Sequence, residues 1–242
     1  IDSSGEHPIS ELVVAPGVDP KKLLALIIDT AGPGLRIWTR GDAAPLNDIL
    51  PALGFTLRRT LLKLHRSLAQ PPIPDPVWAP GVAVRTFVAG SDETAWLEVN
   101  NAAFAGHPEQ ADWTIADITA REQEPWFDPA GFFLAEVNGK LCGFHWTKVH
   151  VHHPTHRPAD EPAKAGAHVM PHPYGEVYVI GVAPGMQGKR LGEALLLHGL
   201  RYLRDRGLQL VVLYVEADNT SASALYARLG FTRGNADRLY TR

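Results

Sequence analysis

The hydrophobic pattern between residues 82 and 149 changes period along the chain, from strand-like runs to helical spacing and back. It predicts one strand, two helices and then two more strands. The Asn138-Gly139 pair between the last two strands is typical of a tight hairpin turn. The predicted elements are Val82–Phe87, Glu93–Phe104, Ile115–Glu124, Gly131–Glu136 and Lys140–Val149.

A second patterned segment begins with the β-rich run Val177–Val182 and ends beyond Phe231. After the first strand, the pattern predicts a helix opened by a glycine-rich turn, the strand Leu210–Val215, the helix Ser221–Leu229 and a closing strand. The complete order is β-α-α-β-β-loop-β-α-β-α-β. This order predicts an α/β (α+β) fold in which a mixed central sheet is flanked by helices.

The N-terminal part of the chain repeats the order of the second segment. Each copy has a β-rich run closed by Val-Ala-Pro-Gly, at Glu11–Gly17 and at Glu176–Gly185. Each copy continues with a Leu- and Ala-rich helical stretch, a second strand (Gly34–Thr39 and Gln209–Glu216) and a Leu-Gly-Phe-Thr run whose glycine ends a helix. These matches predict tandem copies of one fold. The N-terminal copy is incomplete, because the early strands are missing from it.

A proline-rich segment separates the two copies. Four prolines within Ala69–Pro76 exclude a helix or a central strand. We therefore expect a partial N-terminal domain over residues 1–68, a linker over 69–81 and a catalytic domain over 82–242. The chain opens with Ile1 rather than Met, and we expect a fragment or a processed product.

The bulk composition argues against several classes of protein. The 242 residues carry a net charge of −3 and an isoelectric point of about 6.4, and charges are interleaved rather than gathered on the basic face typical of nucleic-acid binding. No apolar run approaches the roughly 20 residues of a membrane span, and the start has no signal-peptide pattern. We expect a cytoplasmic monomer without nucleic-acid or membrane partners. Cys142, the single cysteine, excludes an internal disulfide and lies in an apolar run typical of a buried structural thiol.

Residues 150–173 are rich in Pro, His, Ala and charge and show no periodicity, which predicts a loop. The spacing of its histidines fits no tetrahedral metal pattern, and no cysteine joins them. An ordinary polar loop is therefore favoured over a metal site. The histidines are His150, His152, His153, His156, His168 and His172.

A glycine-rich turn with basic residues follows the strand Val177–Val182. The run from Gly185 to Gly192 opens a helix, so several backbone N–H groups and the positive end of the helix dipole point at one spot. Lys189 and Arg190 add positive charge there. The turn is typical of pyrophosphate binding, and a simple strand-to-helix connection has the same pattern.

This turn and the elements after it resemble the GNAT superfamily of N-acetyltransferases. The superfamily signature Gln/Arg-x-x-Gly-x-Gly/Ala is met at Gln187 and Gly192 and departs at Arg190, where the family usually has Gly. The resemblance implies an acyltransferase that uses acetyl-coenzyme A as co-substrate and needs no metal. The residues implied for coenzyme binding are Ile180, Gly181, Val182, Gln187, Gly188, Lys189, Arg190, Leu191, Gly192, Glu193, Asn219, Thr220, Ser221, Ala222, Ser223 and Ala224.

Five further runs are long and specific: Asn100–Gln110, Trp126–Pro129, Gly143–Lys148, Gly175–Val179 and Leu213–Glu216. They resemble actinobacterial members of the superfamily that have two tandem domains and acetylate the cysteinyl amine of a cysteine–glucosamine–inositol conjugate. The resemblance covers nearly the whole chain and is strongest from about residue 82 onward. It implies that conjugate as the small-molecule substrate. It also implies substrate contacts from Glu109, Lys148, Glu176 and Tyr214.

Three catalytic roles follow from the same resemblance. Amine acetylation requires loss of a proton from the ammonium, polarisation of the thioester carbonyl and protonation of the leaving thiolate. By resemblance, Glu176 is the general base, the backbone amide of Ile180 binds the developing oxyanion and Tyr226 is the general acid. The alternatives without a catalytic role are that Glu176 is a surface residue at the edge of its strand and that Tyr226 is a buried core residue.

The N-terminal copy departs from the phosphate-binding pattern. Asp19 would repel phosphate, and Pro20 lacks an N–H donor. We expect this copy, whose first strand contains Leu12, Val13 and Val14, to bind coenzyme weakly or not at all and to act as a scaffold.

Two alternatives remain open at this point. One is an acetyltransferase for another small amine or for a protein N-terminus. The other is a decayed binding protein without enzymatic activity, because of the incomplete N-terminal copy and Arg190.

Overall fold

The structure is a computed structural model that describes residues 9–11, 19–31, 34–42, 45–107, 110–151 and 173–242. The chain divides into two compact units. Unit 1 comprises residues 1–65 and 214–242, and unit 2 comprises residues 66–213.

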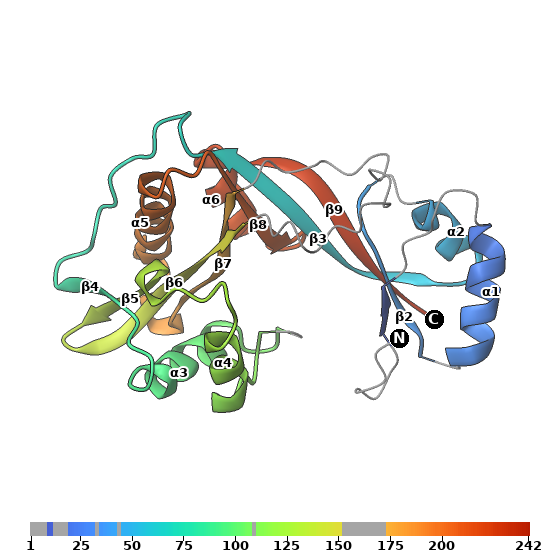
Figure 1. The fold of residues 1–242 in the computed structure, drawn as a ribbon, viewed down its shortest axis with the longest axis horizontal. Coiled ribbons are helices and arrows are strands. Elements are labelled where there is room, and N and C mark those ends of the chain that lie inside the picture. The colour runs from blue at the N-terminus through green and yellow to red at the C-terminus, as the bar shows by residue number, and fades with distance from the viewer. Residues whose placement is uncertain (1–8, 12–18, 32–33, 43–44, 108–109, 152–172) are drawn as a thin grey trace. The chain divides into compact units, whose positions relative to one another are not determined.

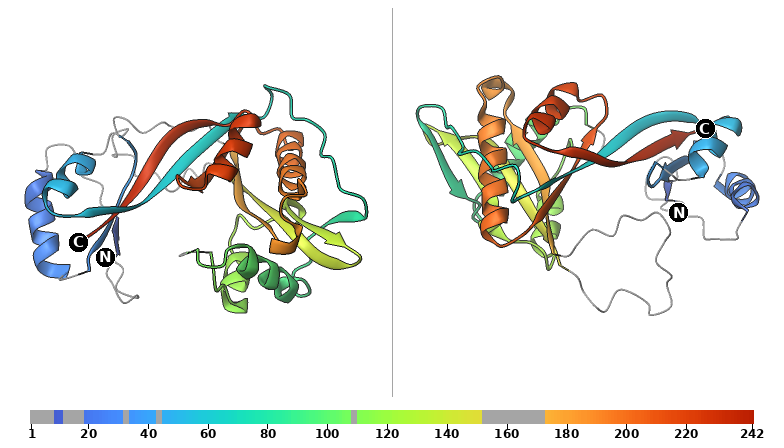
Figure 2. Two further views of the ribbon diagram at one scale, coloured as in Figure 1. Left: turned by 180° about the vertical axis from the view of Figure 1, so that it is seen from behind. Right: turned by 90° about the horizontal axis from the view of Figure 1, so that it is seen from above.

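Unit 2 is built on a mixed sheet with the strand order β8-β7-β6-β5-β4 (Figure 1). Only the β7–β8 pair is parallel, and the other neighbours are antiparallel. Helices α3 and α4 cover one face of the sheet, and α5 covers the other (Figure 2). The elements are β4 (Val82–Thr86), α3 (Glu93–Ala103), α4 (Ile115–Glu122), β5 (Phe132–Val137), β6 (Lys140–His150), β7 (Tyr174–Val182), α5 (Leu191–Asp205) and β8 (Leu210–Glu216), of which the last three residues are grouped with unit 1.

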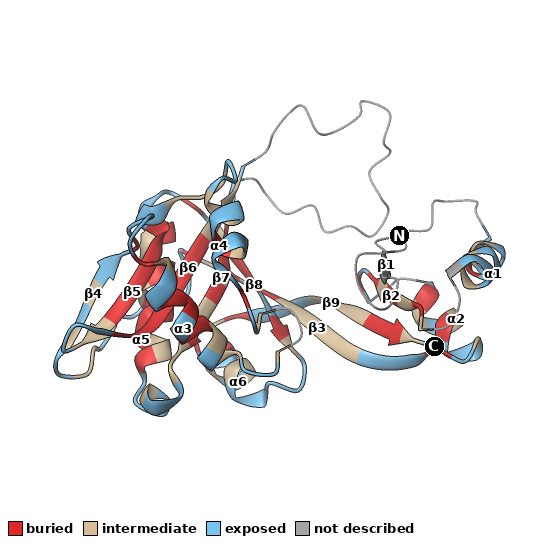
Figure 3. Cartoon of the chain, turned by 90° about the horizontal axis from the view of Figure 1, so that it is seen from below, coloured by how far each residue is buried: buried red, intermediate tan, exposed pale blue. Residues whose placement is uncertain are grey.

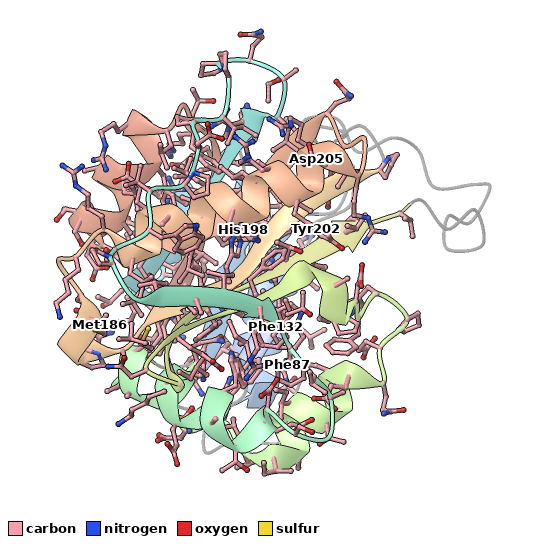
Figure 4. The ribbon with its side chains drawn as sticks, turned by 90° about the vertical axis from the view of Figure 1, so that its left-hand side faces the viewer. Phe87, Phe132, Met186, His198, Tyr202 and Asp205 are labelled. Carbon is pink, nitrogen blue, oxygen red and sulfur yellow. The ribbon has the colours of Figure 1, made fainter. Side chains whose placement is uncertain are left out.

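The core under α3 and α4 is made of stacked and edge-packed aromatic rings. Trp96 of α3 is fully buried, and its ring meets those of Phe132, Phe144 and Trp146 at centroid distances of 5.3–5.8 Å. Phe132 also stacks on Phe87 at 4.4 Å (Figure 4). Burial of large rings stabilises a fold strongly, because each removes a large apolar area from water. Figure 3 shows the buried residues concentrated along β5, β6 and β7.

The proline-rich segment 69–81 belongs to unit 2 and packs along α5. Ile73 is only 5% exposed, Asp75 forms an ion pair with Arg201, and the Trp78 ring lies 5.8 Å from that of His198. The expected linker is therefore a strap that is fixed to the helix. Its prolines exclude helix and strand pairing, as predicted, but they do not prevent side-chain contacts.

Unit 1 has the strand order β1-β2-β9-β3. Its core contains Leu24, Ile37, Leu50 and Phe55 from the N-terminal part of the chain together with Tyr240 from β9. The C-terminal strand is therefore part of this core. The elements are β1 (Ile9–Glu11), α1 (Pro20–Ala31), β2 (Arg36–Thr39), α2 (Leu46–Ala52), β3 (Thr56–Ser67), α6 (Thr220–Arg228) and β9 (Thr232–Thr241).

The mixed α/β fold and the predicted order of elements from residue 82 onward are confirmed. Cys142 is buried, and its thiol donates to the carbonyl of Ala135 at 3.2 Å. The predicted loop at residues 150–173 differs from the structure at its first residue, because β6 runs through His150, whereas β7 begins at Tyr174, directly after the predicted loop. These two residues pair across the hairpin, and the pairing extends both strands.

The two compact units are not the two halves of the sequence. Strand β9 pairs along its length with β3 and at its end with β2, so residues 214–242 group with residues 1–65 instead of with the expected domain 82–242. Strand periodicity shows which face of a strand is buried but not which strand is its neighbour. The sequence therefore predicted the strand β9 without its partners.

His145 on β6 is fully buried against α5. Its Nδ1 lies 2.9 Å from the carbonyl oxygen of Leu195, and burial lowers its pKa to about 4. The ring lies on the backbone of Gly199, where a Cβ would be 2.2 Å from the nearest ring atom. This contact holds α5 against the sheet and requires a residue without a side chain.

We expect Gly199→Ala to lower the free energy of unfolding by about 1–3 kcal/mol, because a new methyl group must displace a buried ring. Gly192→Ala in the same helix is the matched control, since a Cβ there would meet Val182 at an ordinary 3.5 Å. That variant should be neutral or up to about 1 kcal/mol more stable. Urea unfolding of both variants measures the difference, and equal midpoints would contradict the packing argument.

Candidate active site

The hydrogen-bonded ladder between β7 and β8 is short. Its pairs run from Gly175–Val211 to Val177–Leu213 and go no further. On its other side, β7 pairs with β6 along its length, with a bulge that leaves Tyr178 without a direct partner. The strands therefore separate on the β8 side of β7 just after the position of Glu176.

The backbone amide of Ile180 points toward this separation. Ala183 N–H donates to Cys142 C=O at 2.9 Å across β6 and β7. Hydrogen-bonded and non-hydrogen-bonded pairs alternate in an antiparallel ladder. The register is unbroken there, so the His145–Ile180 pair is of the non-hydrogen-bonded kind. The N–H of Ile180 faces away from β6, toward the side on which the β8 ladder has ended.

Glu176 lies on β7 with only 9% of its surface exposed. Its Oε2 is 2.5 Å from Nε2 of His150, the last residue of β6. The His150 ring stacks on Tyr174 at a centroid distance of 4.5 Å, and burial, with a smaller contribution from the charge of Glu176, raises the pKa of Tyr174. A carboxylate that is shielded from water and held by one donor is well placed to accept a proton at its other oxygen.

Lys148 stands directly opposite Glu176 in the register of β6 and β7. Its ammonium does not bind the carboxylate. It lies 4.0 Å from the centroid of the Trp126 ring and 5.4 Å from that of Tyr178. Arg121 of α4 donates to the Tyr178 hydroxyl at 3.1 Å. Cations and aromatic rings thus gather on the α3–α4 face of the sheet beside Glu176.

The turn between β7 and α5 presents free backbone donors. Among the described residues, the amides of Gly188 to Gly192 have no backbone acceptor, and the first bond of α5 is from Ala194 N–H to Arg190 C=O at 3.1 Å. The Gln187 side chain closes the turn by donating to Val182 C=O at 3.2 Å. A row of unpaired amides at a helix N-terminus fits a pyrophosphate group.

Arg190 keeps the backbone that glycine would adopt at this position. It has φ of +60° and forms the N-cap of α5 in the left-handed conformation. Its side chain is exposed, and the space around the Cβ position of neighbouring Gly188 is open. The departure from the glycine signature therefore leaves the turn open, at a cost of about 1–2 kcal/mol for a left-handed residue with a Cβ.

Tyr226 lies in unit 1, on α6. The residue is 8% exposed, its ring packs edge-on against Phe231 at 5.6 Å, and burial raises the pKa of its hydroxyl to about 12. The phenol therefore carries its proton at neutral pH. Its oxygen has no side-chain hydrogen-bond partner among the residues described, which leaves the proton available for donation.

The other candidates in unit 1 lie at the start of α6 and on β8. Asn219 is the N-cap, and its Oδ1 accepts from Ala222 N–H at 3.1 Å. This capping role explains Asn219 structurally, while the first turn of α6 (Thr220 to Ala224) carries the remaining coenzyme candidates. Tyr214 on β8 is 42% exposed, and its ring centroid lies 5.6 Å from the ammonium of Lys63 on β3.

Several candidates fall outside the described residues. These are Glu109, the residues Leu12, Val13 and Val14 of the predicted first strand, and the histidines 152, 153, 156, 168 and 172. Asn100 donates to the carbonyl of Gln110 at 3.0 Å, which fixes the chain directly after Glu109. In the described part of the chain, no cluster of His, Cys, Asp or Glu is arranged for a metal ion. No helix within that part has the length and apolarity needed to cross a membrane.

Sequence reasoning missed His150, Trp126, Tyr178 and Arg121 as neighbours of the candidate residues. Alternation along β6 would have placed His150 on the same face as Lys148. The contact with Glu176 also depends on the register of β6 against β7, which an intervening loop separates in sequence. No local signal in the sequence specifies that register.

We expect Arg190→Gly to be more stable toward unfolding than Arg190→Ala by about 0.5–1 kcal/mol. Both variants remove the same charged side chain, but only alanine retains the strain of the left-handed conformation, and glycine loses part of the gain through backbone entropy. Thermal and urea unfolding of the two variants side by side measure this difference. Equal stability would mean that the turn relaxes out of the left-handed conformation.

Solved structures with a similar fold support the architecture. A GCN5-related N-acetyltransferase from Sphaerobacter thermophilus superposes with a TM-score of 0.65 at 24% identity, covering 92% of this chain and 64% of that one. A tandem GNAT protein from the clavulanic acid biosynthesis pathway superposes with a TM-score of 0.64 at 16% identity, covering 98% of this chain and 75% of that one. At these identities the likeness shows the fold alone.

Proteins of similar sequence indicate which group of acetyltransferases this chain resembles. The mycothiol acetyltransferase of Thermobispora bispora is 48% identical over 98% of this chain and 77% of its own length. That of Parafrankia sp. is 50% identical over 96% of this chain and 75% of its own length. That of Streptomyces coelicolor is 45% identical over 97% of this chain and 71% of its own length.

The model of the acetyltransferase (GNAT) family matches residues 95–231, which include most of α3, the elements from α4 to α6 and every candidate residue of the described site. Together with 45–50% identity to relatives over nearly its full length, this match shows that the chain belongs to the acetyltransferase (GNAT) family and, within it, to the mycothiol acetyltransferases.

Proposed function

We propose that this acetyl-coenzyme A-dependent N-acetyltransferase transfers the acetyl group to the cysteinyl amine of desacetyl-mycothiol, the cysteine–glucosamine–inositol conjugate. This mycothiol synthase reaction is the last step of mycothiol biosynthesis. The observation that carries the proposal is the 48% identity to a mycothiol acetyltransferase over 98% of the chain, which includes both compact units. The site geometry supports the chemistry independently.

Glu176 is the general base in this mechanism. Its carboxylate is shielded from bulk water, and only one oxygen has a hydrogen-bond partner among the described residues. The other oxygen accepts a proton from the substrate ammonium, directly or through a water molecule, and the resulting amine attacks the thioester carbon. Shielding from water strengthens this interaction, because the effective dielectric constant falls.

The amide of Ile180 stabilises the oxygen that becomes negative during the attack. The support is its direction, away from β6 and toward the open side of β7. A fixed amide needs no reorganisation as the charge develops, which is the source of oxyanion stabilisation. Tyr226 donates its proton to the departing sulfur, and its raised pKa keeps that proton in place until it is needed.

The residues that would hold the coenzyme are the turn from Gln187 to Glu193 and the first turn of α6. The amides of Gly188 to Gly192 would donate to the pyrophosphate, and Lys189 and Arg190 would supply charge. The backbone of Ile180 to Val182 would line the thioester arm. The co-substrate supplies the activated acetyl group.

The conjugate is cationic and rich in hydroxyl groups, and such ligands are bound by a few polar groups among aromatic ones. Lys148 and Glu176 beside Trp126 and Tyr178 provide this combination on unit 2. We assign Tyr214 and Glu109 to the same substrate by their resemblance to the family. The N-terminal copy acts as a scaffold without coenzyme, and the protein works as a cytoplasmic monomer.

The wild-type protein should release coenzyme A thiol when acetyl-coenzyme A and desacetyl-mycothiol are both present. Glu176→Gln should lower kcat by about 10²–10⁴-fold, because the amide cannot accept the proton. The KM for acetyl-coenzyme A should change by less than about 3-fold if the glutamate acts on the amine alone.

Two results would overturn the proposal. Turnover with a polyamine or a peptide N-terminus and none with the conjugate would reassign the substrate. Absence of acetyl-coenzyme A binding in calorimetry would leave a binding protein without activity.

Tyr226→Phe should lower kcat by about 10²-fold with little change in the KM for either substrate, because it removes only the proton donor. Tyr240→Phe is the matched control, since Tyr240 is 3% exposed in the same unit and lies in the hydrophobic core. The control should keep full activity. A similar loss of activity in both variants would show that Tyr226 acts through the packing of unit 1.

A further inference from the structure

The imidazole of His150 has no role in the mechanism described above, although it touches the proposed general base. We propose that His150 is a positioning residue for the acetyl transfer: its Nε2 holds one carboxylate oxygen of Glu176 so that the other oxygen faces the substrate ammonium. This inference rests on the proposed function of Glu176.

The backbone places the two side chains together. Lys148 pairs with Glu176 and His150 pairs with Tyr174, so the histidine lies one cross-strand step away on the diagonal from the glutamate. Diagonal neighbours in a sheet are within reach of long side chains. Nε2 of His150 and Oε2 of Glu176 are 2.5 Å apart, and the side chains are 27% and 12% exposed. The contact is thus formed largely away from water.

The imidazole ring itself is held in place by Tyr174. The two rings stack at 4.5 Å with an interplanar angle of 14°. A stacked ring cannot rotate freely, so the nitrogen that meets the carboxylate is fixed in direction. Positioning of this kind keeps a reactive group within the small angular range that proton transfer requires.

The nearest alternative partner of the carboxylate is engaged elsewhere. Lys148 is the direct cross-strand neighbour of Glu176, but its ammonium lies 4.0 Å from the centroid of the Trp126 ring. Within the described residues, His150 is therefore the single side chain that hydrogen-bonds to Glu176. A lysine in its place would neutralise the carboxylate with a mobile charge and leave its orientation free.

His150 neither gains nor loses a proton during the proton transfer. An ionised carboxylate only accepts hydrogen bonds, so Nε2 of His150 carries the hydrogen and donates it to Oε2. The ammonium proton passes to Oε1 of Glu176, giving a neutral amine and a neutral carboxylic acid. The bond from Nε2 to Oε2 is kept throughout, and the acid later releases its proton to water.

The test compares His150→Gln with His150→Leu. The side-chain nitrogen of glutamine can occupy the place of Nε2 and donate to the carboxylate, whereas leucine fills space without a donor. We expect His150→Leu to lower kcat by about 10–100-fold, with the KM for acetyl-coenzyme A within about 2-fold of wild type, and His150→Gln to restore most of kcat. His65→Gln, a partly exposed histidine of unit 1, is the matched control and should be unchanged.

A second readout does not depend on turnover. Nitrogen-15 chemical shifts of the histidine rings in the free enzyme should identify Nε2 of His150 as the protonated nitrogen, and the signal should shift in Glu176→Gln. Full activity of His150→Leu, equal loss in the leucine and glutamine variants, or an Nδ1-protonated ring would each overturn the inference. If the wild type does not acetylate the conjugate, the proposed function fails, and the nitrogen shifts still decide whether His150 holds Glu176.

Discussion

The divergence of β7 from β8 after Val177 is the constraint on which unit 2 depends. A strand that loses one neighbour in the interior of a sheet exposes backbone groups that normally pair, and a buried unpaired amide costs about 1–3 kcal/mol. A ligand whose acceptors hydrogen-bond to these amides offsets this cost on binding. The sheet can carry the defect because the β6–β7 pairing on the other side continues past it, with a single bulge at Tyr178.

The two faces of this sheet differ in packing and in polarity. The face under α5 is closed by close contacts, such as the ring of His145 on Gly199, and by the strap of residues 69–81. The face under α3 and α4 has an aromatic core near β5, and it becomes polar toward the end of β6, where Lys148 and His150 lie. The closely packed face thus supports strands whose polar ends carry the proposed catalytic groups.

Much of unit 2 follows from the hydrophobic pattern alone. The helix α3 and the strands β5 and β6 lie within a few residues of their predicted bounds, because each has a long apolar pattern and clear turn signals on both sides. Glu176 and Ile180 were also placed on the correct strand. These features depend on local sequence, which a single chain displays directly.

The pairing of strands that are far apart in the chain could not be predicted, because local sequence does not encode it. The contact of His150 with Glu176 requires the register of two strands across a long loop, and the place of β9 requires a choice among several antiparallel partners. Arg190 shows a different limit. The glycine in the signature provides a positive backbone angle φ. In this structure an arginine adopts that conformation, with φ of +60°.

The place of β9 also affects how the chain acquires its structure during synthesis. Proteins commonly fold domain by domain from the N-terminus as they leave the ribosome. Here the sheet formed by the first 65 residues takes in a strand from residues 232–241, and Tyr240 completes its hydrophobic core. The unit that contains residues 1–65 therefore stays unfinished until residues 232–241 have been synthesised, and a chain truncated before residue 232 lacks one strand of that unit.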